Sequence, residues 1–159
     1  DLARGRTVRS LSRLLTNYPN ISQIFVAPSQ LQIGQDILDD LKEKGVSYSL
    51  TDDLRLAVSK SDAVYMTRIQ DEWDNKQGES QEIDTSRFVF GTEELKLLKP
   101  TGVILHPLPR RNEIDVAVDA DPRAMYWRQM RNGMWIRAAL IAETFGCGKR
   151  IFDYYSHNL

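Results

Sequence analysis

The 159-residue chain has little cysteine, no long apolar run and almost no net charge. Its single cysteine, Cys147, excludes an internal disulfide and favours a reducing compartment. No apolar stretch approaches the ~20 residues that span a bilayer, so we expect no membrane partner. The net charge of −1 provides no general attraction to nucleic acid, which we also exclude as a partner.

Several common catalytic patterns are also missing. No G-x-G-x-x-G follows an expected strand, which argues against dinucleotide binding, and no phosphate-binding P-loop occurs. The chain contains two histidines, His106 and His157, with no clustered cysteines, and it offers no nucleophile–base pair. We therefore expect no metal site and assign no catalytic side chain within this chain.

The composition is that of an ordinary globular domain. Hydrophobic residues make up 42% of the chain and charged residues 27%. Arginines outnumber lysines by 14 to 7, and arginine suits bidentate binding of carboxylates and phosphates. A small anionic substrate is one interpretation of this bias. Solvated helix faces are the alternative, and for most of these arginines they explain it better.

Strand and helix patterns alternate along the chain. Short apolar runs predict strands at 23–27, 46–50, 63–66, 87–90 and 103–105. Helical spacing and capping residues predict helices over 7–17, over 33–41 with Gly45 as the C-terminal cap, after Asp52 or Asp53, from Thr92 as N-cap, and from Asp121-Pro122 to Gly146. The polar stretch 70–86 is expected to form a long mobile loop.

This alternation predicts an α/β fold, a parallel sheet flanked by helices on both faces in a Rossmann-like single domain. The domain should cover residues 1–146, and residues 147–159 should form a C-terminal tail. Ligands of such folds bind outside the carboxyl ends of the strands. The residues that directly follow each strand are therefore the first candidates for a binding site.

Arg68 and Gln70 follow the strand expected at 63–66. If the chain stays extended there, residues two apart point the same way, so a guanidinium and an amide can face one ligand. This pair suits a carboxylate-bearing substrate. The alternative is a surface ion pair of Arg68 with a nearby acid, Asp71 or Glu72.

The segment His106-Pro107-Leu108-Pro109 follows the strand expected at 103–105. Two prolines that bracket one residue produce a rigid turn, with a cis bond before Pro109 as one option. Such a turn can present carbonyl oxygens to an NH2-bearing ligand, although it can equally be only a stiff loop. At the other end of the chain, Arg6 opens a helix, which is a natural position for an anion.

Three segments together carry a family resemblance. Residues 5–11 (GRTVRSL), 65–70 (YMTRIQ) and 106–110 (HPLPR) resemble, in order and spacing, the second half of aspartate carbamoyltransferases. Further similarity lies in residues 113–126 and 132–140. Each motif alone is moderately specific, whereas the ordered set is highly specific and extends to about Gly146.

The resemblance implies a substrate for each segment. Arg6 and Arg68 are expected to bind the two carboxylates of L-aspartate, with Gln70 orienting it and Thr7 assisting. Carbamoyl phosphate is expected to place its NH2 group against carbonyls around Pro107 and Leu108.

Pro109 is expected to shape that turn. The family joins the two substrates into N-carbamoyl-L-aspartate and phosphate, an early step of pyrimidine synthesis, and similar enzymes use no metal or organic cofactor. Holding two anions in attack geometry provides the catalysis. Similar enzymes form homotrimers with shared active sites, and they occur in the cytoplasm or in plastids.

The resemblance also implies an incomplete site. The family's phosphate-binding motifs belong to an N-terminal carbamoyl phosphate domain, and none of them occurs here. The first residues, 1–6, have no signal-peptide character and resemble the interior of a longer protein. In similar proteins the first strand of this domain directly precedes this segment, so the sheet is expected to lack it. The isolated chain is therefore expected to be inactive.

Two alternatives stay open at this point. Ornithine carbamoyltransferase shares the fold, but its members carry His-Cys-Leu-Pro where this chain has residues 106–109, and Arg68 would repel a cationic acceptor. A non-catalytic interaction or regulatory module derived from a carbamoyltransferase is the other. Motifs of the missing half encoded directly upstream would argue against such a module.

Overall fold

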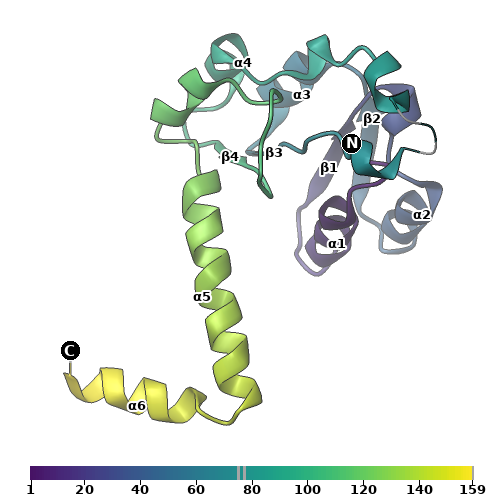
Figure 1. The fold of residues 1–159 in the computed structure, drawn as a ribbon. Helices are drawn as coiled ribbons and strands as arrows, with labels where there is room; N and C mark the ends of the chain where they lie inside the picture. Colours follow the sequence, from purple (N-terminus) through teal and green to yellow (C-terminus); the bar gives the residue numbers. More distant parts are fainter. Residues whose placement is uncertain (75, 77, 159) are drawn as a thin grey trace.

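The computed structural model describes residues 1–74, 76 and 78–158. The α-helices of this part are α1 (Arg6–Leu15), α2 (Gln35–Glu43), α3 (Leu54–Lys60), α4 (Thr92–Leu97), α5 (Tyr126–Thr144) and α6 (Gly148–Asn158). The strands are β1 (Ser22–Val26), β2 (Ser47–Thr51), β3 (Ala63–Tyr65) and β4 (Val103–Leu105). Short 3-10 helices lie at η1 (Ser29–Leu31), η2 (Asp71–Trp73), η3 (Glu79–Glu82), η4 (Ser86–Phe88) and η5 (Val116–Ala120). Strands and helices alternate as predicted (Figure 1).

The strands pair in parallel, as predicted, but they form two pairs within the described residues. β1 pairs with β2, with Phe25 opposite Leu50, and β3 pairs with β4, with Val64 opposite Ile104. A cavity of about 910 Å³ lies between these pairs and is lined by residues of both β1 and β3. The parallel α/β fold is confirmed, and its sheet is open between β1 and β3.

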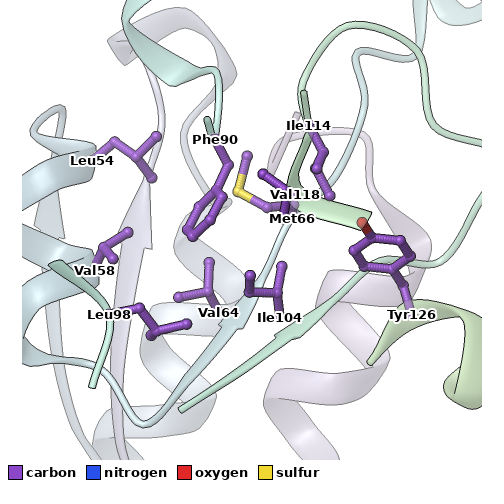
Figure 2. Close-up of a cluster of buried hydrophobic side chains, with 10 residues drawn as sticks. All are labelled: Leu54, Val58, Val64, Met66, Phe90, Leu98, Ile104, Ile114, Val118 and Tyr126. Atoms are coloured by element: carbon purple, nitrogen blue, oxygen red, sulfur yellow. The ribbon is translucent and has the colours of Figure 1, made fainter. Parts of the chain in front are cut away.

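Helices cover both faces of β1. Phe25 and Ala27 pack into a core cluster with α1 and α2, whereas Val26 packs on the other side against a second cluster. Alternate residues of a strand point to opposite faces, which explains this division. The second cluster, drawn in Figure 2, consists of Leu54, Val58, Val64, Met66, Phe90, Leu98, Ile104, Ile114, Val118 and Tyr126. The segments that follow β3 and β4 pack on these two cores.

Two predicted helix caps are confirmed. Gly45 follows α2 in the left-handed region, with φ of 66°, where a residue without Cβ is favoured. Asp53, rather than Asp52, caps α3, because its Oδ1 accepts a hydrogen bond from the Leu56 N–H at 2.9 Å. The side chain of Asp52 lies instead 3.5 Å from Arg87 at the surface.

Two predictions near α4 are wrong. Residues 87–90 do not form a strand, because Ser86–Phe88 form a 3-10 turn and only Phe90 makes a bridge, to Ile114. Thr92 does not cap α4, since it lies inside the helix and Gly91 is the N-cap. Glu94 reaches back to accept the Gly91 N–H at 3.0 Å, and this bond satisfies the free backbone donor.

The predicted helix start at Asp121-Pro122 is also wrong, because α5 begins at Tyr126. The residues before it continue the sheet: Ile104 N donates to Arg123 O at 2.8 Å, and Met125 N donates to Ile104 O at 2.9 Å. Backbone groups engaged with β4 cannot also form the first helical turn. Asp121 instead pairs with Arg123.

The last part of the chain projects away from the body. Figure 1 shows α5 extending outward, with α6 at its far end. Residues 148–158, expected to belong to a tail, form the helix α6. Along both helices large apolar side chains are exposed: Trp127, Met130, Met134, Trp135, Ile136, Leu140, Ile141, Ile151, Phe152, Tyr154 and Tyr155. Among the described residues, no helix combines the length and apolarity that crossing a membrane requires.

Candidate functional site

Three segments meet at the carboxyl ends of β3 and β4. The backbone nitrogen of Asp1 donates to Thr67 Oγ1 at 3.0 Å, which joins the segment before α1 to the residues after β3. Arg111 Nη1 contacts Asp71 Oδ2 at 2.7 Å, which joins the residues after β4 to the same region. The three segments that carry the predicted site residues are therefore neighbours, as expected for parallel strands.

Arg6 and Thr7 open α1, and both are exposed. The first backbone N–H groups of a helix have no intrahelical acceptor, so this end of α1 favours an anion. Among the residues that the structure describes, no acid pairs with the Arg6 guanidinium. Its charge is thus available to a ligand.

Arg68 already holds a carboxylate. Its Nη1 donates to Glu72 Oε2 at 2.8 Å, and its Nη2 donates to Glu72 Oε1 at 2.5 Å. These hydrogen bonds lower the pKa of Glu72 to about 2, so Glu72 is ionised at neutral pH. The ion-pair alternative from the sequence, Arg68 with Glu72, is confirmed. The bidentate geometry is also the one in which an arginine binds a substrate carboxylate.

Gln70 is held by its backbone. Its N–H donates to Asp1 Oδ2 at 3.2 Å, and its carbonyl accepts from Arg4 Nη1 at 3.1 Å. The same Arg4 nitrogen lies 2.7 Å from Asp74 Oδ1, and the Ser80 hydroxyl also bonds to Asp74.

No sequence pattern predicted this supporting network. Arg4 lies 66 residues from Gln70 and 70 from Asp74 in sequence. No local pattern predicts a contact across such a separation. The network also explains why part of the stretch 70–86 forms the ordered turns η2 and η3 rather than a structureless loop. Within that stretch, positions 75 and 77 lie outside the described residues.

The turn after β4 combines a cis Leu108–Pro109 bond with a left-handed Leu108, whose φ is 54°. The rigid turn predicted from the two prolines, including the cis option, is confirmed. The carbonyls of Pro107 and Leu108 accept no hydrogen bond from any residue that the structure describes. Both residues are half-buried, so these two acceptors are free for a ligand that donates hydrogen bonds.

Arg110 anchors the far side of this turn. Its two terminal nitrogens donate to Asp119 at 2.5 and 2.6 Å, and its guanidinium lies 5.7 Å from the ring centres of Tyr126 and Trp127. The Tyr126 hydroxyl donates to Asp119 as well. Tyr126 is fully buried, and burial raises the pKa of its hydroxyl to about 12 with help from Asp119. The turn is thereby tied to the start of α5.

The arrangement can bind anions and hydrogen-bond donors. In the described part of the chain, no cluster of histidine, cysteine or acidic residues has the geometry to hold a metal ion. The segments that meet here carry two arginines, one amide side chain and two carbonyls that accept no hydrogen bond from the described residues.

Comparison with known proteins identifies the domain. The model of the family described as "Aspartate/ornithine carbamoyltransferase, Asp/Orn binding domain" matches residues 1–144. The chain is 43% identical over 141 residues to the chloroplastic aspartate carbamoyltransferase of Oryza sativa subsp. japonica, covering 89% of this chain and 39% of the relative. It is 40% identical over 147 residues to the aspartate carbamoyltransferase catalytic subunit of Clostridium novyi (strain NT), covering 92% of this chain and 47% of the relative.

A solved structure agrees in fold. Aspartate transcarbamoylase from Trypanosoma cruzi, in complex with carbamoyl phosphate and aspartate, superimposes with a TM-score of 0.80 at 37% identity, covering 89% of this chain and 47% of that one. This chain therefore spans less than half the length of these three relatives. The chain belongs to the aspartate/ornithine carbamoyltransferase family and carries that family's Asp/Orn-binding domain.

Proposed function

We propose that this chain is the aspartate-binding half of an aspartate carbamoyltransferase. The observation that carries the proposal is the meeting of an arginine in bidentate carboxylate geometry with two free carbonyls at one edge of the fold. Arg111 and Asp71 join the two segments directly. Relatives that share 40–43% of its residues are named aspartate carbamoyltransferases, which favours this acceptor over ornithine.

In this proposal L-aspartate binds between the start of α1 and the segment after β3. Arg68 exchanges Glu72 for one substrate carboxylate, and Arg6 binds the other. Gln70 orients the substrate, and Thr7 assists at the helix end. Because Glu72 is exposed, its pair with Arg68 contributes little to stability and can be replaced by a substrate.

Carbamoyl phosphate binds at the turn after β4. Its NH2 group donates to the carbonyls of Pro107 and Leu108, and Pro109 maintains the shape of the turn. The aspartate amine attacks the carbamoyl carbon and forms a C–N bond. The C–O bond to phosphate breaks, its electron pair leaves with the phosphate, and the departing phosphate takes up the proton that the amine loses. The domain accelerates this step by orienting the two substrates.

The complete site requires residues beyond this chain. We propose that an N-terminal carbamoyl phosphate domain of the same polypeptide binds the phosphate, and that the complete enzyme is a homotrimer in pyrimidine biosynthesis. The isolated chain is then inactive. Its compartment is the cytoplasm, with a plastid as the alternative that the chloroplastic relative from rice suggests.

The test is an assay of carbamoyl transfer by the longest native polypeptide that contains this chain, called the parent polypeptide below. L-aspartate and L-ornithine are offered as acceptors to the parent, to residues 1–159 alone and to an Arg68→Ala parent. Arg87→Ala is the matched control, because Arg87 forms an exposed ion pair with Asp52 and, among the described residues, makes no hydrogen bond or ion pair with a proposed site residue.

We expect turnover with aspartate in the parent and in the Arg87 variant, and strong loss in the Arg68 variant and in the isolated chain. Turnover with L-ornithine instead would mean that ornithine, and not aspartate, is the acceptor substrate. Absence of turnover with either acceptor would favour a non-catalytic module. Robust activity of residues 1–159 alone would contradict the proposal that the complete site requires residues beyond this chain.

A further inference from the structure

His106 is a fully buried polar residue at the end of β4, and it is not among the residues assigned to substrate. Its backbone N–H donates to Gln129 Oε1 of α5 at 2.9 Å. Both ring nitrogens are also engaged, one with Leu108 and the other with Glu113. A buried imidazole with a specific partner at each ring nitrogen can hold those partners in position.

The partners define the position of the ring proton. The Leu108 N–H lies 2.8 Å from Nδ1, and a backbone N–H can only donate, so Nδ1 must be the acceptor. Nε2 lies 2.7 Å from Glu113 Oε1, and a carboxylate can only accept, so Nε2 carries the proton. His106 is therefore a neutral imidazole with its proton on Nε2.

Glu113 extends this arrangement to the far side of the turn. Its two carboxylate oxygens accept the Arg111 N–H at 3.1 and 3.2 Å. Its own carbonyl accepts the Phe90 N–H at 2.8 Å, which ties it to the core. Burial alone would raise the pKa of Glu113, but the hydrogen bonds from His106 and the backbone outweigh it, so the pKa lies below its usual value.

The bond from Leu108 to His106 has a direct consequence for Pro107. The Pro107 carbonyl and the Leu108 N–H belong to one planar trans peptide, in which they point in opposite directions. By accepting the N–H, His106 directs the carbonyl away from itself. Leu108 also has a left-handed backbone, which a residue with a Cβ adopts only when neighbours hold it.

We infer that His106 is a positioning residue that aims the Pro107 carbonyl at the carbamoyl NH2 group, with Glu113 holding its ring in the required tautomer. The inference rests on the proposed function, since it concerns the same turn. It assigns distinct tasks to the two ring nitrogens. Nδ1 orients the peptide that faces the substrate, and Nε2 orients the ring.

Two substitutions separate these tasks in the parent polypeptide. In His106→Asn, the side-chain oxygen can replace Nδ1 as acceptor for Leu108, but the bond to Glu113 is lost. In His106→Gln, the longer side chain can replace Nε2 at Glu113, but the acceptor for Leu108 is lost. The measurements are KM for each substrate, kcat, and thermal unfolding of each variant.

We expect His106→Gln to lose roughly 10- to 100-fold in kcat/KM for carbamoyl phosphate, the effect of a small displacement of a contact group. His106→Asn should keep most of this value, and KM for L-aspartate should change little in either variant. Nitrogen NMR of the histidine-labelled parent, with the His106 signal identified by its loss in a variant, should show a proton on Nε2.

Equal losses in the two variants, or a failure of both to fold, would overturn the inference and leave His106 a purely structural residue. A proton on Nδ1 would overturn it as well. A parent that transfers no carbamoyl group would instead refute the proposed function. An active parent with an unimpaired His106→Gln variant would refute the positioning role alone.

Discussion

Arg68 binds Glu72, four residues further along the chain, through two hydrogen bonds. The arginine proposed to bind a substrate carboxylate is thus occupied by a carboxylate of its own chain. In the proposed binding mode, Glu72 orients the guanidinium and is displaced when the substrate binds. The planar group with two parallel donors, and not only its positive charge, is what such binding requires.

Arg68→Lys should therefore impair binding although it preserves the charge. A lysine offers one ammonium and cannot make two parallel hydrogen bonds, so one charge-assisted bond is lost. We expect KM for L-aspartate to rise roughly 10-fold or more, the effect of losing one such bond. Steady-state kinetics of the parent polypeptide measure this, with KM for carbamoyl phosphate nearly unchanged. Arg87→Lys is the control, and an equal effect there would argue against a specific role.

Asp119→Asn should lower stability at neutral pH by about 1–3 kcal/mol, because Arg110 and the buried Tyr126 lose a charged acceptor. Urea unfolding of the parent at pH 7 measures this. Asp62→Asn is the matched control, since Asp62 is exposed and pairs with Lys99 at the surface. A similar loss in both variants would refute the anchoring role of Asp119.

The loss of stability in Asp119→Asn should depend on pH. Hydrogen bonds from Arg110 hold the pKa of Asp119 below its ordinary value of 3.8. The folded pKa is depressed, so the carboxylate contributes its full stability above pH 3.8 and loses it as the pH falls through the folded pKa. Wild type and Asp119→Asn should therefore approach each other in stability as the pH falls below 3.8. A constant difference down to the acid transition would contradict this linkage.

Asp53→Ala should destabilise the parent by about 1 kcal/mol, because the first turn of α3 loses its side-chain cap. Asp52→Ala should have a much smaller effect, since Asp52 makes only an exposed ion pair. The two neighbouring aspartates differ in one geometric contact, so denaturant unfolding of both variants isolates the cap. Equal losses would mean that charge near the helix start, and not the cap, is responsible.

Gly45→Ala should destabilise by about 1 kcal/mol, because alanine resists the left-handed φ of 66° that follows α2. Apart from the two neighbouring residues, no atom lies within 4 Å of the added Cβ, so the backbone conformation alone determines the loss of stability. Gly133→Ala inside α5 should stabilise by up to about 1 kcal/mol, as its Cβ would meet only the flexible end of Arg137. Thermal unfolding compares the two, and the same sign in both would contradict the argument.

Local patterns predicted much of the fold. Apolar spacing predicted α1, β1, α2 and α3 to within a few residues, and the cap at Gly45 follows from its lack of a Cβ. The errors near α4 and α5 have one cause. Phe90, Arg123 and Met125 place backbone groups in contacts with residues distant in sequence, and these contacts override local preference.

The sequence by itself determined the family, the order of strands and helices, and the residue types that are proposed to bind two anionic substrates. The motifs that carry this information are short, so the order and spacing of residues along the chain are enough to recognise them. Only the tertiary structure decided that Arg68 holds Glu72, that Arg4 ties Gln70 to Asp74, and that His106 holds Leu108. Side-chain partners are chosen by proximity and direction in three dimensions, and neither the partner of Arg4 nor the proton position on His106 is encoded in a short motif.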